Sequence, residues 1–157
     1  MVSSPGLGRK HHVCFLSLQV FVVGMRRAKT ARMLTGIRIL VVDADAAGAK
    51  LAAVVLRAAG AKVTVATDAE QALERVDAER PRVLALDLHL PSVSGLVLAR
   101  ILSQLAWSPP LTIVGLATGN GKKLEAEALA AGCAAYFEKP IDERLVQVVS
   151  NALGEHR

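Results

Sequence analysis

Residues 84–91 read Leu84-Ala85-Leu86-Asp87-Leu88-His89-Leu90-Pro91. An apolar run that ends in one carboxylate and is followed by a proline predicts a short buried strand and then a turn. In an open parallel sheet, ligands bind at the C-terminal edge of the strands, near the point where the strand order reverses. Asp87 is therefore the first candidate for a functional residue.

The composition suits one folded domain. The chain has 157 residues, of which 52% are hydrophobic, so it is long enough to bury a core. Aromatic residues make up only 3%, and aliphatic side chains and alanine must therefore build that core. Cys14 and Cys133 lack the spacing of a metal site or a disulfide framework, which fits a reducing compartment. We expect a cytoplasmic protein.

Residues 1–35 are unlike the rest and are predicted to be an extension that is disordered or arises from a mispredicted start. Met25 and Met33 are alternative starts. Within the extension, Val13 to Gly24 is almost entirely apolar but shorter than the roughly 20 residues that span a bilayer. It also lacks the small-residue cleavage site of a signal peptide. We expect no membrane association.

The net charge of +5 belongs to this extension. Residues 1–32 contain six basic residues and no acidic one, whereas the remainder has thirteen basic and fourteen acidic residues. A basic domain would indicate a nucleic-acid partner, but here the predicted folded part is close to neutral. We expect no nucleic-acid partner.

From residue 36 onward, apolar runs alternate with segments of helical periodicity. The runs predict strands over 37–42, 62–66, 83–86, 111–116 and 134–138. A helix follows each of them, and Asp45, Thr67 or Asp68, and Asp142 are suitable N-caps. Four helices have apolar residues at helical spacing on one face, as an amphipathic helix packed on a core has: Leu51, Val54, Val55 and Ala58; Ala72, Leu73 and Val76; Leu98, Ile101, Leu102 and Leu105; Leu145, Val148, Val149 and Leu153.

Alternation of strands and helices predicts an α/β fold, a doubly wound parallel sheet covered on both faces. Right-handed crossovers place the C-terminal ends of all strands at one edge of the sheet. The polar and strand-end residues that meet at this edge are Asp43, Asp45, Asp87, Ala117, Thr118 and Lys139.

Three carboxylates and a lysine at one edge form a charge-dense site. Crowded carboxylates repel one another, and a hard divalent cation such as Mg²⁺ would neutralise them. A carboxylate beside a metal ion and a lysine can accept a phosphoryl group, because both cations neutralise the phosphoryl oxygens. Each residue alone has a simpler role: Asp45 can cap a helix, Asp87 can lie in a turn, and Lys139 can be a solvated lysine. Only their joint placement favours a site.

The motifs that carry a family resemblance are Ile39-Leu40-Val41-Val42-Asp43-Ala44-Asp45, Leu86 to Pro91 with Ser94-Gly95-Leu96, Ala130-Ala131-Gly132 with Tyr136, and Lys139-Pro140. With them, the sequence from Ile37 to Gly154 resembles the response-regulator receiver domain of two-component signalling. The resemblance implies a flavodoxin-like (βα)5 fold of strand order 2-1-3-4-5, with the receiver domain over residues 36–157. It implies a histidine kinase or phosphotransfer protein as partner, a downstream protein target, no enzyme activity beyond self-phosphorylation and autodephosphorylation, and compatibility with a dimer.

The resemblance also implies roles for single residues. Asp87 matches the phosphoacceptor and, with Asp43, a magnesium ligand. His89 matches the position whose backbone carbonyl binds the metal. Lys139 matches the lysine that pairs with the phosphoryl group, and Lys139-Pro140 matches a peptide bond that is usually cis in the family.

Two positions depart from the family pattern. The second acidic residue, a direct metal ligand, is replaced by Ala44, and Asp45 lies one position later. The switch hydroxyl is replaced by Ala117, with Thr118 next to it, while Tyr136 matches the aromatic switch. We expect weaker magnesium binding and weaker coupling of phosphorylation to surface change, because contacts that differ between the two states are missing.

Three functions remain open. The chain is predicted to be a receiver that accepts a phosphoryl group on Asp87 and, with no output domain after Arg157, either stands alone or is a fragment. The alternative is a degenerate receiver that binds proteins without phosphorylation. A remote alternative is a phosphatase of the haloacid-dehalogenase type that uses Asp43 and Asp45, because Asp43-Ala44-Asp45 also resembles the Asp-x-Asp start of those enzymes.

Overall fold

Five parallel strands form one sheet in the computed structural model, which describes residues 29–119 and 121–155. The strands are β1 (Arg38–Val42), β2 (Lys62–Ala66), β3 (Val83–Asp87), β4 (Thr112–Ala117) and β5 (Ala135–Glu138). Their order is β2-β1-β3-β4-β5, and every neighbouring pair is parallel. This confirms the predicted flavodoxin-like fold. It also places the C-terminal ends of β1 and β3 side by side, where the strand order reverses.

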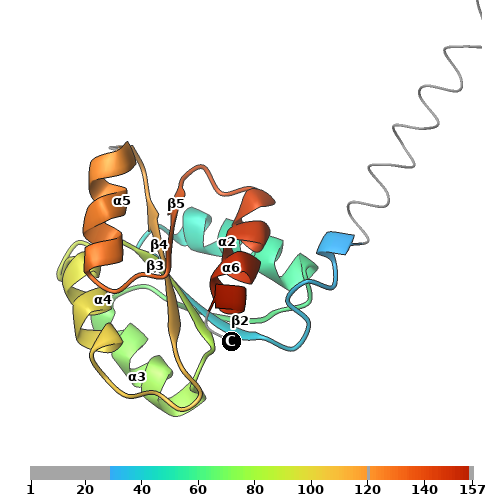
Figure 1. Ribbon diagram of the computed structural model, residues 1–157, viewed down its shortest axis with the longest axis horizontal. Coiled ribbons are helices and arrows are strands. Elements are labelled where there is room, and N and C mark those ends of the chain that lie inside the picture. The colour runs from blue at the N-terminus through green and yellow to red at the C-terminus, as the bar shows by residue number, and fades with distance from the viewer. Residues whose placement is uncertain (1–28, 120, 156–157) are drawn as a thin grey trace, which may run out of the picture.

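Five helices cover the two faces of the sheet (Figure 1). They are α2 (Ala46–Ala58), α3 (Ala69–Glu79), α4 (Gly95–Ser103), α5 (Gly121–Ala130) and α6 (Arg144–Glu155). One apolar cluster joins the sheet to α2 and α6, and a second joins the opposite face to α3, α4 and α5. Because β3 lies between β1 and β4 in the middle of the sheet, all five of its residues are buried.

Short polar side chains begin three of these helices. Asp45 accepts hydrogen bonds from two backbone N–H groups at the start of α2, and Asp68 accepts one from Gln71 N at the start of α3. Ser94 accepts one from Leu96 N at the start of α4. Each of these bonds satisfies a backbone donor that has no partner within the helix. The predicted caps at Asp45 and Asp68 are confirmed.

Only α2 buries a different face from the predicted one, whereas α3, α4 and α6 bury most of the residues predicted for their inner faces. On α2, Leu51 and Val54 are 45% and 53% exposed, and the buried residues are instead Ala49, Ala52, Ala53 and Leu56. The same correction applies to Leu73 of α3 and to Ile101 of α4, which are exposed although their predicted neighbours are buried. Leu105 follows the end of α4 and is also exposed, and Val148 of α6 is only half-buried. On α2, small alanine side chains pack against the sheet, so the larger Leu51 and Val54 turn outward.

The described chain begins before the predicted domain boundary at residue 36. Leu34 is fully buried in the α2–α6 cluster, and its N–H donates to the carbonyl of Ala59 at 3.0 Å. The end of the predicted extension is therefore part of the core, whereas residues 1–28, with the apolar Val13–Gly24, lie outside the described residues. Over 29–119 and 121–155, no helix is both long and apolar enough to cross a membrane.

Gly95 allows α4 to begin against the end of β3. A Cβ at this position would collide with the backbone oxygen of Asp87 and would lie 2.6 Å from Leu88 Cα. We therefore expect Gly95→Ala to lower the free energy of unfolding by about 2 kcal/mol in urea denaturation, because backbone rather than a flexible side chain must move. Gly154→Ala in α6 is the control, since a Cβ there meets nothing within 4 Å. Its change should stay within about 0.5 kcal/mol. Equal stability of the two variants would contradict the close approach.

Candidate functional site

One lysine joins two carboxylates at the C-terminal edge of the sheet. Asp43 directly follows β1, Asp87 is the last residue of β3, and Lys139 directly follows β5. Lys139 Nζ donates to Asp43 Oδ2 at 2.8 Å and to Asp87 Oδ2 at 3.1 Å. The structure thus brings together three of the residues that the sequence assigned to this edge.

The backbone fixes the second oxygen of each carboxylate. Asp43 Oδ1 accepts from Asp45 N at 2.9 Å, and Asp87 Oδ1 accepts from His89 N at 2.8 Å. Both bonds reach the N–H two residues later, as in an Asx turn. Each carboxylate therefore has one oxygen held by its own loop and the other by Lys139, which fixes the orientation of both groups.

Lys139 is itself held by the main chain. Its N–H donates to the carbonyl of Ala117 at the end of β4, at 2.7 Å. The peptide bond between Lys139 and Pro140 is cis. The lysine side chain is 15% exposed, so its ammonium group reaches the two carboxylates from a largely covered position.

Burial changes the proton affinity of these groups. Asp43 is 1% exposed, and burial raises its pKa, although hydrogen bonds from Lys139 and Asp45 act in the opposite direction. For Lys139, burial alone would lower the pKa, but its bonds to Asp43 and Asp87 raise it overall. Lys139 therefore stays protonated at neutral pH, and the site combines one cation with two closely placed carboxylates.

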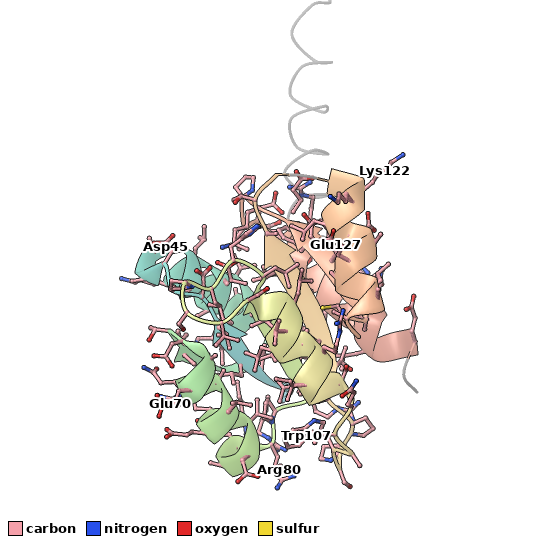
Figure 2. All side chains as sticks on the ribbon, turned by 90° about the vertical axis from the view of Figure 1, so that its left-hand side faces the viewer. Asp45, Glu70, Arg80, Trp107, Lys122 and Glu127 are labelled. Carbon is pink, nitrogen blue, oxygen red and sulfur yellow. The ribbon has the colours of Figure 1, made fainter. Side chains whose placement is uncertain are left out.

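Asp45 has a different place from Asp43. Its side chain accepts from Ala47 N and Gly48 N and thus caps α2, and the residue is exposed (Figure 2). A Cβ at Gly48 would lie 3.0 Å from Asp43 Oδ2 and 3.1 Å from Asp45 Oδ2. The first turn of α2 thus borders both carboxylates, and a side chain at residue 48 would press on their oxygens. The phosphatase interpretation needs Asp45 as an acid/base beside its nucleophile, and a capping side chain does not suit that role.

The donors suit a magnesium ion that keeps several waters. Among the described residues, no group of three or more His, Cys, Asp and Glu side chains is placed to hold a metal. Mg²⁺ needs no such group, because it commonly binds through one or two carboxylates and retains water. Because Gly48 has no Cβ, the space next to Asp43 Oδ2 is not taken up by a side chain at residue 48. Asp43 and Asp87 therefore fit the ion.

Thr118 lies outside the site. Ala117, the last residue of β4, is fully buried, whereas Thr118 is exposed in the loop that follows. Because the Ala117 carbonyl accepts the N–H of Lys139, a backbone shift that turned Thr118 inward would break this bond. The structure therefore does not bring Thr118 to the carboxylates, and the His89 side chain is likewise exposed although its N–H binds Asp87.

Tyr136 packs on the same face of the sheet as Ala117. In the β4–β5 register, Tyr136 is opposite Gly115 and Ala117 is opposite Glu138, so Tyr136 and Ala117 are diagonal neighbours. Tyr136 contacts the α3–α4–α5 cluster, and its buried hydroxyl has no hydrogen-bond partner among the described residues. Its pKa is raised by burial first and by Glu138 and Glu125 next. A methyl group at residue 117 offers this hydroxyl nothing to bind.

Gly48 and Gly95 are the positioning residues that sequence reasoning missed. The sequence motifs place Gly95 only in the family pattern and give Gly48 no role. In the structure, both are the close-approach points between a helix start and an aspartate at the sheet edge. A glycine in the first turn of a helix that follows a strand-end aspartate is the signal that could have found them.

Comparisons with known proteins agree with this geometry. The family model of the response regulator receiver domain matches residues 39–150. A protein-glutamate methylesterase/protein-glutamine glutaminase of Myxococcus xanthus is 41% identical over 106 residues, covering 66% of this chain and 30% of that protein. The chain thus spans less than a third of that relative. An uncharacterised 14.6 kDa protein of Leptolyngbya boryana is 34% identical over 113 residues, covering 69% of this chain and 86% of that protein.

A solved structure has the same fold. The crystal structure of a response regulator from Chloroflexus aurantiacus superposes with a TM-score of 0.71 at 28% identity, covering 76% of this chain and 99% of the other. The family match extends from β1 to α6 and includes Asp43, Asp87 and Lys139. The chain belongs to the response regulator receiver domain family.

Proposed function

We propose that this receiver domain of two-component signalling accepts a phosphoryl group on Asp87. The observation that carries the proposal is the pair of hydrogen bonds from Lys139 Nζ to Asp87 Oδ2 and Asp43 Oδ2. A lysine at this place can neutralise a phosphoryl oxygen once Asp87 is modified. Receiver domains are typically signalling modules rather than enzymes, and they act together with a histidine kinase.

In the proposed step, the phosphoryl group moves from its donor to a carboxylate oxygen of Asp87. A carboxylate oxygen of Asp87 forms a bond to phosphorus. The bond from phosphorus to a histidine nitrogen or an acyl oxygen of the donor breaks, and that donor atom keeps the electron pair. The product is an acyl phosphate on Asp87. Lys139 keeps its proton throughout and supplies positive charge beside the new phosphoryl oxygens, as its raised pKa favours.

The remaining residues orient Asp87. The N–H of His89 fixes one carboxylate oxygen, and Gly95 lets α4 begin directly behind the phosphoacceptor. Bound Mg²⁺ would neutralise charge on the phosphoryl oxygens, and Asp43 and Asp87 would hold it, with the backbone carbonyl of His89 as the third proposed protein ligand. Because Ala44 provides no carboxylate and Asp45 caps α2, we expect the affinity for magnesium to be low.

A second function is favoured by a specific observation. Ala117 has no hydroxyl, and the buried Tyr136 hydroxyl has no partner among the described residues. A receiver whose switch residues do not respond to phosphate would act as an interaction module, with its conformation set by a bound protein. In either case we propose that the downstream partner is a protein.

Phosphorylation is tested by incubating the chain with acetyl phosphate and Mg²⁺ and measuring the intact mass. We expect the mass of one phosphoryl group on the wild type and none on Asp87→Asn, because only the carboxylate can form the acyl phosphate. Glu127→Gln is a matched control of an exposed carboxylate and should behave as the wild type. No increment at high magnesium would overturn phosphorylation on Asp87 and leave the interaction module.

Removing Lys139 leaves two buried carboxylates without their cation. In chelator at neutral pH, we expect Lys139→Gln to lower the free energy of unfolding in urea by about 2 kcal/mol. Because the folded pKa is raised above 10.5, the difference should be present below pH 10.5 and should disappear as the pH rises further. Arg75→Gln, which removes the partly exposed ion pair with Glu79, should cost less than about 0.5 kcal/mol. Equal losses in the two variants would argue against the buried pair.

Ionisation of the Asp43 carboxyl group should lower the free energy of unfolding of the metal-free protein. Its folded pKa is raised above 3.8, so the folded state holds the proton more tightly than the unfolded state. The stability of the wild type relative to Asp43→Asn should therefore fall as the pH rises above 3.8. Urea denaturation in chelator at several pH values between about 4 and 7 measures this difference. Parallel pH profiles for the two proteins would show that ionisation of Asp43 carries no cost.

A further inference from the structure

A groove lies between α2, α6 and the start of the described chain, away from the phosphoryl site. Its volume is about 420 Å³, and its floor includes Val54, Val55 and Ala58 of α2 and Val146 of α6. Val54 is 53% exposed. An exposed apolar surface of this kind marks a site where another apolar surface docks. We call it the α2–α6 groove.

We propose that the apolar segment Val13–Gly24 of the same chain docks in the α2–α6 groove. The first argument is connectivity. Thr30 and Ala31 form one wall of the groove, so the chain that precedes Lys29 starts at its rim. Residues 25–29 separate the segment from this wall, and five residues reach at most about 17 Å. That length is enough for a reversal of the chain and keeps the segment near the groove.

The second argument is chemical complementarity. The segment is almost entirely apolar and contains Phe15 and Phe21, and the groove is also apolar, with no aromatic residue among the described residues that line it. Glu143 is the acidic residue of the lining, and Arg26-Arg27 directly follow the segment. An arginine at the rim beside Glu143 would orient the segment, while burial of its apolar side chains would supply most of the binding free energy.

The third argument is the effective concentration of a tethered ligand. A segment joined by a short linker is present at millimolar local concentration, so even weak apolar contacts fill the groove. Val97 and Ile101 of α4, with Leu105 just after it, are similarly exposed, but they lie on the opposite face of the sheet from the start of the described chain. These residues provide a control surface on the same molecule.

Methyl NMR spectroscopy tests the proposal without reference to phosphorylation. The full chain is compared with a chain that begins at Met25, which keeps every described residue and removes the segment. We expect the Val54, Val55 and Val146 methyl signals of the full chain to be shifted by the rings of Phe15 and Phe21, with nuclear Overhauser contacts to those rings. The Val97 and Ile101 methyl signals should be the same in both chains.

A charge placed in the groove provides the second variant. Val54→Asp in the full chain should abolish the contacts to Phe15 and Phe21, whereas Val97→Asp on α4 should leave them unchanged. Identical Val54 and Val146 signals in the two chains would overturn the proposal. Shifts that grow with protein concentration would overturn the proposal, because they would show that a second copy of the chain fills the groove. Ring contacts that vanish when phosphatidylglycerol vesicles are added would also overturn it, because they would show that the segment prefers a lipid surface.

Discussion

The ammonium group of Lys139, shared between Asp43 and Asp87, is the interaction on which the site depends. It joins residues that are 96 and 52 positions apart in sequence, and it does so at the edge where β1, β3 and β5 end. Without the lysine, two buried carboxylates would face each other in a weakly solvated site, which is costly. The same contact orients both carboxylates, and in the proposed function its positive charge would lie beside the phosphoryl group. The Lys139 ammonium group and the carboxylates of Asp43 and Asp87 therefore contribute both to the stability of the fold and to the proposed chemistry.

The sequence was sufficient for the fold because each strand ends in a recognisable way. Asp43, Asp87 and Lys139 each follow an apolar run, and right-handed crossovers necessarily bring such ends to one edge. The helix faces were predicted less well. Aliphatic spacing pointed to Leu51 and Val54 of α2, but this helix buries Ala49, Ala52, Ala53 and Leu56. Periodicity identifies an amphipathic helix without saying how closely it packs, and an alanine face allows a closer approach to the sheet than a leucine face.

The two departures from the family pattern differ in what the structure offers in compensation. At the proposed magnesium site, Asp43 and Asp87 remain, and Gly48 adds no side chain at the start of α2, so the residues still fit a hydrated ion. At the switch, the backbone of Ala117 is tied to Lys139, and Thr118 cannot turn inward without losing that bond. Sequence adjacency therefore suggested substitutes at both places, but geometry supports neither Asp45 nor Thr118 in those roles. In the proposed function, acceptance of a phosphoryl group and the response to it therefore depend on different residues.

The α2 helix connects the chemistry with the surface. Its first turn borders Asp43 through Gly48, and its outer side forms the α2–α6 groove with Val54 and Ala58. A ligand on the outer side would contact a helix whose first turn borders Asp43 and whose alanine face packs against the sheet. A ligand in the groove can alter the site only by its different affinity for two positions of this helix. The alanine packing of α2 thus leaves Val54 exposed in the groove that we propose as a docking site, on the same helix whose first turn borders Asp43.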